Sequence, residues 1–287
     1  MATKKAKVML WVLLSLTVLF CVFCVIAPAF EPNDPNLANL AAAKQPPSEQ
    51  YPWGTDGLGR CVFSRVLAGA STSVFSALAI VGLTLVIGSA IGILAGYFGG
   101  KADAILMCVV DIFLAFPGMV LALAVAGMLG LGMKNAVIAL TASCWPQYAR
   151  LARSAVLSLR QENFVSAAKL NGQTPASILW RHILPNAMRP VIVTASLSIG
   201  GTILALSGLS FLGLGAQPPV AEWGSMLADG RGLMQRCPWM VLYPGLAIFL
   251  TSALFNLLGD CVRDVLDPLD STNVFLKERK KRTRCKK

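Results

Sequence analysis

The sequence is short of charged residues. Of its 287 residues, 14% are charged and 55% are hydrophobic, and the mean hydropathy is +0.65. A soluble globular domain carries about a quarter charged residues. The shortage therefore excludes an ordinary water-soluble protein and makes the lipid bilayer the solvent in which this chain has to fold.

Residues for two kinds of chemistry are also missing. The phosphate-binding pattern G-x-x-x-x-G-K-[ST] does not occur, because Lys101 follows Gly100 but is itself followed by Ala102. Histidine occurs once, as His182, so no histidine cage for a metal ion can be assembled. We therefore expect no catalytic, cofactor or metal site on this chain. A metal, if one is handled, would travel as a complex or on another protein.

Long apolar runs are what the sequence has in abundance. A helix needs about 20 apolar residues to cross a hydrocarbon core about 30 Å thick. Six segments reach this length, although Pro146 and Arg150 interrupt the fourth. The first is too long for the apolar region of a signal peptide and is expected to be retained. The sequence thus predicts an all-α integral membrane protein with six transmembrane helices, at residues 8–27, 73–98, 104–129, 135–155, 191–212 and 241–260.

Basic residues predict the orientation of these spans, since Lys and Arg accumulate on the cytoplasmic side. With the N-terminus inside, both termini are cytoplasmic. Basic residues then gather at the N-terminus, between the fourth and fifth spans, and in the tail. Of the 25 Lys and Arg, those left outside are Lys44, Arg60, Arg65, Lys134, Arg231 and Arg236.

Three regions follow from this topology. Residues 1–72 hold a cytoplasmic tail, the first span and a proline-rich outer loop. That loop ends in an expected interfacial helix, with an apolar stripe that includes Leu58, Val62 and Val66. Residues 73–268 hold the other five spans. Residues 269–287 form a basic cytoplasmic tail that anionic lipid headgroups attract. The net charge of +11 needs no nucleic-acid partner, because no aromatic platform or nucleic-acid-binding fold is visible.

Two features within the spans are candidates for special roles. Gly88, Gly92 and Gly96 recur every four residues and predict close helix packing, because small residues let helices approach in lipid. Asp111 is a carboxylate at membrane depth. Such a residue is costly and is therefore a functional candidate, with a structural hydrogen bond as the alternative.

The eight cysteines give no firm pattern. Cys21 and Cys24 form a C-x-x-C within an apolar helix. Redox chemistry requires access and a lowered thiol pKa, so packing is the favoured role. Cys61 and Cys237 fall in outer loops, and a disulfide between them is left open.

Residues 164–186 are polar and lie between the fourth and fifth spans, on the cytoplasmic side. They predict two short helices around Asn171–Gly172, with Thr174 as the cap of the second helix. An apolar stripe on that helix is formed by Ile178, Leu179, Ile183 and Leu184, and Pro185 and Pro190 are expected to end it before the next span. Such a pair of helices suits docking into a groove on a cytoplasmic partner, and a solvated connecting loop is the alternative.

This segment resembles the signature loop of ABC-importer permeases, E-A-A-x3-G-x9-I-x-L-P. Here Ser166 replaces the Glu and His182 replaces the Ile. The matching residues are Ala167, Ala168, Gly172, Leu184 and Pro185. Further stretches resemble the peptide/nickel branch of the family and cover most of the chain. They are "WGTDGLGRCVFSRVLAGA" (53–70, with Cys61 where the family usually has Asp), "DIFLAFP" (111–117), "YARLARSAVLSLRQENFV" (148–165), "LSFLGLGAQPPVAEWGSML" (209–227) and "FNLLGDCVRDVLDP" (255–268).

The resemblance implies a type I ABC importer permease fold in the bacterial inner membrane. Such a subunit forms half of the translocation path and performs no chemistry itself. It implies a second, homologous permease, two cytoplasmic ATPases that bind ATP and Mg²⁺, and an extracytoplasmic solute-binding protein. The coupling helix that contacts an ATPase would be built from Ala167, Ala168, Gly172, Ile178, Ile183, Leu184 and Pro185.

The resemblance leaves the substrate open. The run "CWPQYARLARSAVLSLRQENF" resembles the nickel-type proteins slightly more, which favours nickel or a metal chelate, with dipeptides or oligopeptides as the alternative. A membrane thiol redox enzyme using Cys21 and Cys24 is a remote third hypothesis, which labelling of those thiols would separate from transport.

Overall fold

The computed structural model describes residues 4–266, and helices dominate this range. The only extended pairing within it is a single bridge between Thr55 and Cys61. The predicted basic tail, residues 269–287, lies outside the described residues. The helices are α1 (Lys4–Ile26), η1 (Ala27–Phe30), η2 (Leu40–Ala42), α2 (Val62–Phe98), α3 (Gly100–Leu114), α4 (Gly118–Leu129), α5 (Met133–Arg160), α6 (Asn163–Leu170), α7 (Pro175–Ile178), η3 (Leu179–Ile183), α8 (Leu184–Phe211), α9 (Trp223–Gly230), η4 (Arg231–Leu233) and α10 (Trp239–Leu266).

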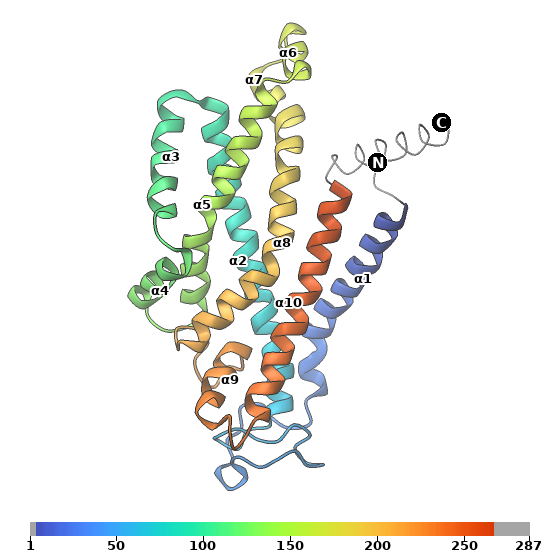
Figure 1. Ribbon diagram of the computed structural model, residues 1–287, viewed down its shortest axis with the longest axis vertical. Helices are drawn as coiled ribbons and strands as arrows, with labels where there is room; N and C mark the ends of the chain where they lie inside the picture. Colours follow the sequence, from blue (N-terminus) through green and yellow to red (C-terminus); the bar gives the residue numbers. More distant parts are fainter. Residues whose placement is uncertain (1–3, 267–287) are drawn as a thin grey trace, which may run out of the picture.

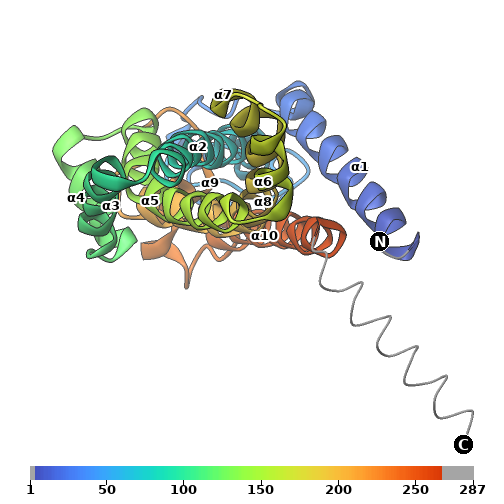
Figure 2. The same cartoon turned by 90° about the horizontal axis from the view of Figure 1, so that it is seen from above.

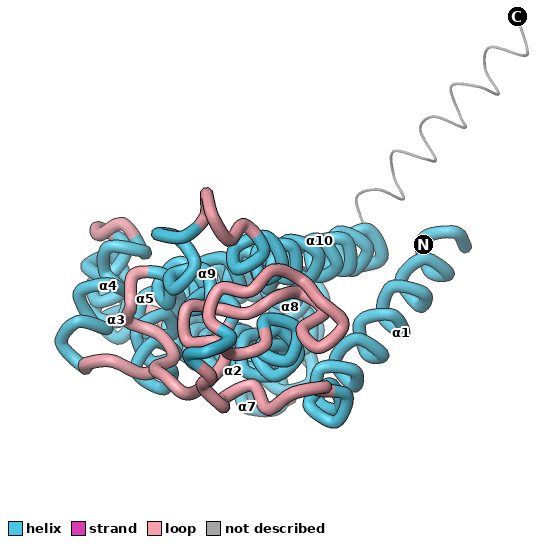
Figure 3. Tube along the Cα trace, turned by 90° about the horizontal axis from the view of Figure 1, so that it is seen from below, coloured by secondary structure: helices cyan, strands magenta, loops and turns pink. Residues whose placement is uncertain are grey.

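The helices α2, α5, α8 and α10 form the centre of an elongated bundle (Figures 1 and 2). Helix α1 leans on α10 at one edge, and α3 and α4 stand at the opposite edge against α5. The loop after α1 and the short helix α9 lie together at one end, where Figure 3 shows the loops crossing the ends of the helices. Helices α6 and α7 project from the other end, so different elements cover the two ends of the bundle.

The helices account for the predicted spans with two differences. Four helical segments are long and apolar enough to cross a membrane: Lys5–Phe30, Val62–Phe98, Pro175–Phe211 and Trp239–Leu266. The predicted third span is broken into α3 and α4, which bend by 89°. Pro117 explains the break, since proline has no N–H to donate and disfavours a helical residue before it. The fourth span is the 28-residue helix α5, which falls short of the apolarity expected of a span because polar residues interrupt it.

The predicted interfacial helix before residue 72 is wrong. Helix α2 begins at Val62 and continues without a break to Phe98, across the boundary placed at residues 72 and 73. The apolar stripe of its first turns does not lie on a lipid surface. Val62 and Val66 are buried in the protein core with Trp223 of α9. Contacts with α9 therefore accompany the extension of α2 beyond the predicted start of the span.

The prediction that Pro185 and Pro190 end the second short helix is also wrong. The chain runs as one helical stretch from Pro175 to Phe211, with Pro190 inside α8. The junction is the π-helical turn η3, where the Leu184 N–H donates to the Leu179 carbonyl five residues earlier. Pro185 directly follows this junction, so its missing N–H falls where the hydrogen-bond pattern changes from π-helical to α-helical.

Candidate functional site

The candidate site is the coupling segment, which we define as residues 163–183 and which comprises α6, the turn after it, α7 and η3. It projects beyond the helices α5 and α8 that carry it (Figure 1). Helix α6 ends where the Gly172 N–H donates to the Lys169 carbonyl at 3.0 Å, and Gly172 has a φ of +72°. Only glycine adopts this left-handed conformation without strain. The turn dipeptide in the sequence therefore ends the helix as predicted.

The second half of the segment begins at the predicted cap. The Thr174 Oγ1 accepts a hydrogen bond from the Ser177 N–H at 3.4 Å, and Pro175 occupies the first turn. Across the turn, the Gln173 amide oxygen lies 3.0 Å from Nε2 of His182. This contact ties the turn between the two short helices to η3.

The apolar stripe of the segment faces the protein itself. Ile178 and Ile183 are 3% and 1% exposed, and they form a cluster with Val165, Ala168 and Val156. Ile93, Tyr97 and Leu159 of α2 and α5 pack against this cluster. The structure therefore places Ile178, Ile183 and Ala168 where they hold the segment on its own bundle. They are not available for direct contact with another protein.

A polar contact also fastens the segment to α2, since the Tyr97 hydroxyl donates to the Pro175 carbonyl at 2.7 Å. At the base of the segment, Arg160 Nη1 at the end of α5 donates to the Gly96 carbonyl of α2 at 2.8 Å. A cavity of about 340 Å³ between Tyr97, Arg160, Lys169 and Ile178 lies behind the segment. The segment is therefore held against α2 and α5 by both apolar and polar contacts.

The outward face of the segment carries apolar residues that the sequence reasoning missed. Leu170 is 89% exposed and Trp180 is 68% exposed, and Ala167 is exposed as well. Pro185, at the start of α8, is also exposed. Leu184 is half-buried. Exposed apolar groups gathered within one polar segment mark an interaction surface. The signal was present in the sequence, because Leu170 and Trp180 are apolar residues off the helical stripe.

Helix α2 approaches α5 closely at three glycines. A Cβ added to Gly88, Gly92 or Gly96 would lie 2.5 Å from the Trp145 carbonyl oxygen, 2.1 Å from that of Ala149, or 3.0 Å from Cβ of Val156, respectively. Real Cβ atoms do not approach other atoms below 3.0 Å. At Gly88 and Gly92 any larger residue would push α5, and with it the coupling segment, away from α2.

Asp111 does not stand alone at membrane depth. Its carboxylate accepts a hydrogen bond from Nη2 of Arg150 on α5 at 2.5 Å, and both side chains are more than half exposed. Two turns away, Asp103 accepts from Nε and Nη2 of Arg153 at 2.5 and 2.6 Å. Both acidic residues of α3 are therefore paired with arginines of α5.

The end of the bundle that holds α9 and the loop after α1 contains buried charges that the sequence reasoning also missed. Glu222 is fully buried, and its carboxylate accepts hydrogen bonds from the N–H groups of Gly224 and Ser225 at 2.9 and 2.8 Å, which caps α9. Burial raises the pKa of Glu222, and these two backbone donors offset part of that rise. Asp56 and Arg60 form a buried pair at 2.6 Å. These contacts are structural, since they fix the start of α2 and α9.

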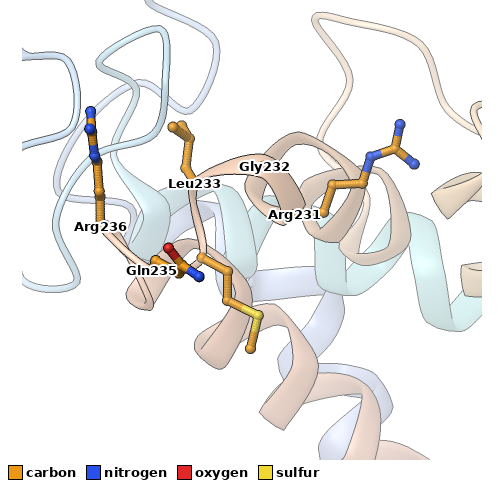
Figure 4. Close-up of a pocket in the computed structure, with 6 residues that line it drawn as sticks. Arg231, Gly232, Leu233, Gln235 and Arg236 are labelled. Carbon is orange, nitrogen blue, oxygen red and sulfur yellow. The ribbon is translucent and has the colours of Figure 1, made fainter.

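A loop at the same end lines a cavity that does not form a convergent site. Its residues, 231–236, include Arg231 and Arg236, and Figure 4 shows these two side chains pointing away from each other. Arg231 instead lies over the ring of Phe211, 5.6 Å from its centroid. This loop therefore offers no paired arginines for one ligand.

The four cysteines that the sequence singled out lie wholly or partly within the protein. Cys61 and Cys237, whose pairing the sequence left open, are both buried free thiols. Cys24 is 0% exposed, and Cys21 is partly buried against the core. A thiol that reacts needs access to its partner, and Cys24 has none.

An apolar helical bundle that carries a protruding, self-supported helical segment at one end is the architecture of a transporter's membrane subunit. Residues 88–269 match the family described as "Binding-protein-dependent transport system inner membrane component". The chain belongs to this family. The recognition made from the signature loop is confirmed.

Curated relatives agree with this assignment. A dipeptide transport system permease protein of Alkalihalophilus pseudofirmus is 45% identical over 224 residues, which cover 78% of this chain and 74% of the relative. A probable D,D-dipeptide transport system permease protein of Escherichia coli K12 is 46% identical, with 80% and 77% covered. A glutathione transport system permease protein of Pectobacterium atrosepticum is 45% identical, with 77% and 74% covered.

A solved structure shows the same fold. An inward-facing structure of the MetNI methionine ABC transporter is 20% identical to this chain and superposes with a TM-score of 0.51, covering 69% of this chain and 95% of that one. At this identity the likeness concerns the fold alone. The predicted type I permease fold is confirmed, and the exact count of six spans is not.

Several conclusions follow for this chain. It is a multi-pass inner-membrane permease subunit of a binding-protein-dependent ABC importer. It is a transport subunit and not an enzyme, as its relatives are. It therefore works with ATPase and solute-binding subunits.

Proposed function

We propose that this chain forms one half of the translocation path of a small-peptide importer. Its other half would be a second, homologous permease, and each permease would bind one of two cytoplasmic ATPases. ATP and Mg²⁺ would be bound by those ATPases. An extracytoplasmic binding protein would deliver the substrate to the end that holds α9 and the loop after α1.

The relatives favour peptides as substrates. The three relatives described above are named for the transport of dipeptides, D,D-dipeptides and glutathione. All three compounds are short and carry free amino and carboxylate groups. The expectation of nickel or a metal chelate finds no support among these relatives. Short peptides, the alternative given by the sequence, therefore take its place.

The observation that carries the mechanism is the coupling segment with its two faces. The inner face, which includes Ile178 and Ile183, is packed on α2 and α5, and the outer face exposes Leu170 and Trp180. This division suits a segment that contacts an ATPase with its exposed face and transmits the motion of the ATPase to the spans through its buried face. We infer that the ATPase contact is made by the exposed residues and supported by the buried ones. We further propose that the segment and both chain termini lie in the cytoplasm.

The burial of Cys24 disfavours a thiol redox role for Cys21 and Cys24. Cys24 lies in the core with no exposed surface, and no part of the transport mechanism needs it. Packing of α1 against the bundle accounts for both cysteines.

Transport of labelled substrates tests the proposed function. Deletion of the gene from its host should abolish uptake of a labelled dipeptide, and the unmodified chain should restore it. Uptake of labelled nickel should be the same in both strains. Loss of nickel uptake with unchanged dipeptide uptake would reverse the substrate assignment. As a control for assembly, the amount of permease in the membrane is measured in each strain.

A further inference from the structure

The exposed face of α5 is polar where a lipid-facing helix would be apolar. Four side chains at intervals of three and four residues share this face: Gln147, Arg150, Ser154 and Ser158, all of them exposed. This spacing places them on one stripe of the helix. By contrast, the exposed residues of α10 between positions 241 and 255 are all apolar, and they are Leu242, Leu246, Phe249 and Leu250.

The centre of the polar stripe lies deep in the membrane. Arg150 stands ten residues before the end of α5 and Asp111 stands eleven residues after the start of α3, which is roughly 15 Å along each helix. Half of a hydrocarbon core is also about 15 Å thick. The Arg150 and Asp111 side chains are nevertheless 57% and 63% exposed. Charged groups at this depth face water or protein, because exposure to lipid is too costly.

The break between α3 and α4 supports a water-filled space at the same depth. It begins about one turn beyond Asp111, with the two helices bent by 89°. Backbone that leaves the helix inside a membrane occurs where it lines a cavity or is covered by protein, and broken helices form substrate sites near the midplane of other transporters. Ser154 and Ser158 are small, so the polar stripe leaves room for a solute beside it.

We infer that this stripe, together with Asp111, is the wall along which the substrate passes, and that the Arg150–Asp111 pair takes the charged end groups of a zwitterionic peptide. Arg150 would bind the peptide carboxylate in place of Asp111, and Asp111 would bind the peptide ammonium group. The exchange keeps each charge at this depth paired with an opposite charge, so a solute that carries both charges passes with the least cost. This assignment of end groups rests on the proposed peptide substrate, whereas the water-lined wall does not.

Thiol accessibility tests the wall without any substrate. In a chain whose eight cysteines are replaced, Ser154→Cys introduces a thiol on the stripe, and Leu250→Cys introduces one on the exposed apolar face near the middle of α10. The whole importer is reconstituted in lipid and treated with a charged methanethiosulfonate reagent. Since that reagent reacts with the ionised thiol in water, we expect Ser154→Cys to react about tenfold faster or more. Equal rates at the two positions would overturn the water-lined wall.

Neutralising the pair tests its role toward the peptide. The double variant Asp111→Asn/Arg150→Gln leaves no unpaired charge, so the permease should reach normal abundance. Dipeptide uptake should fall about tenfold or more, because hydrogen bonds to two charged groups are lost. Unchanged uptake at normal abundance, or a fall in uptake matched by a fall in abundance, would show a structural pair and overturn the inference. An unmodified importer that fails to transport dipeptides would overturn the proposed function alone, because the thiol assay contains no peptide.

Discussion

Replacing Gly172 with valine tests whether the turn of the coupling segment controls the ATPase contact. The backbone of Gly172 has a φ of +72°, and a Cβ built on it meets no atom within 4 Å. The substitution therefore creates no clash in the folded chain. Its whole effect comes from the backbone, since a β-branched residue in this conformation is a strong outlier.

The size of the effect follows from this conformation. A side chain with a Cβ costs about 1–2 kcal/mol in the left-handed region, which lowers the population of the native turn by a factor of roughly 5–30. A rearranged turn would change the angle between α6 and α7 and separate Gln173 from His182. The spans pack through other contacts, such as the Gly92 approach to α5. The variant should therefore insert in the membrane in normal amount.

The assay compares three quantities in the same membranes: permease abundance, co-purification of the ATPase and dipeptide uptake. Gly172→Val should keep its abundance and lose most of both other signals. Gly172→Asn is the matched control, because asparagine tolerates the left-handed region, and it should retain ATPase and uptake. Normal uptake by Gly172→Val would refute the reasoning, because the segment would then be a passive connection.

The remaining predictions use other parts of the fold. Gly92→Ala should lower the melting temperature of the purified permease by several degrees, because its new Cβ would lie 2.1 Å from the Ala149 oxygen and overpacking costs about 1–3 kcal/mol. Gly82→Ala is the control, since no atom lies within 4 Å of its new Cβ, and it should leave the melting temperature unchanged. A Gly92→Ala variant that melts at the same temperature as the unmodified permease would contradict the close packing of α2 and α5. Trp180→Asp should weaken ATPase co-purification without changing permease abundance, because the side chain is 68% exposed at the proposed contact; retention of the ATPase would move the contact elsewhere. Reporter fusions at Lys134 and Gln217 should score outside and a fusion at Gly172 inside, so an inside score at Gln217 would overturn the proposed orientation.

The coupling segment shows which features can be predicted from neighbouring residues in the sequence and which depend on tertiary packing. The Asn171–Gly172 turn and the Thr174 cap were predicted correctly, because a turn and a cap depend on neighbouring residues alone. Which face of the second helix would be buried was not predicted. Helical spacing groups Ile178 with Ile183, but the same stripe could cover the chain's own helices or a partner protein. Only the position of α2 and α5 shows that it covers the former.

The proline predictions failed for a related reason. Pro117 breaks a span, whereas Pro185 and Pro190 lie within one continuous helical stretch. Proline removes one donor in every case, and its effect depends on whether the surrounding backbone can adjust. At residues 179–183 a π-helical turn makes that adjustment. A rule based on the residue type cannot distinguish these contexts.

By itself the sequence determined the membrane setting, the helical class, the polar segment between the spans and the family, because apolar length and short motifs are properties of the chain in order. The tertiary structure alone decided which charges meet and which faces remain open. Asp111 lies 39 residues from Arg150 in the chain, and no pattern in the sequence predicts their contact. In the sequence, no motif or spacing groups Gln147, Ser154 and Ser158 as one surface. They form an exposed stripe because α2 and α8 cover the other faces of α5. Burial and exposure are properties of packed neighbours, and packing is settled only when all the helices are in place.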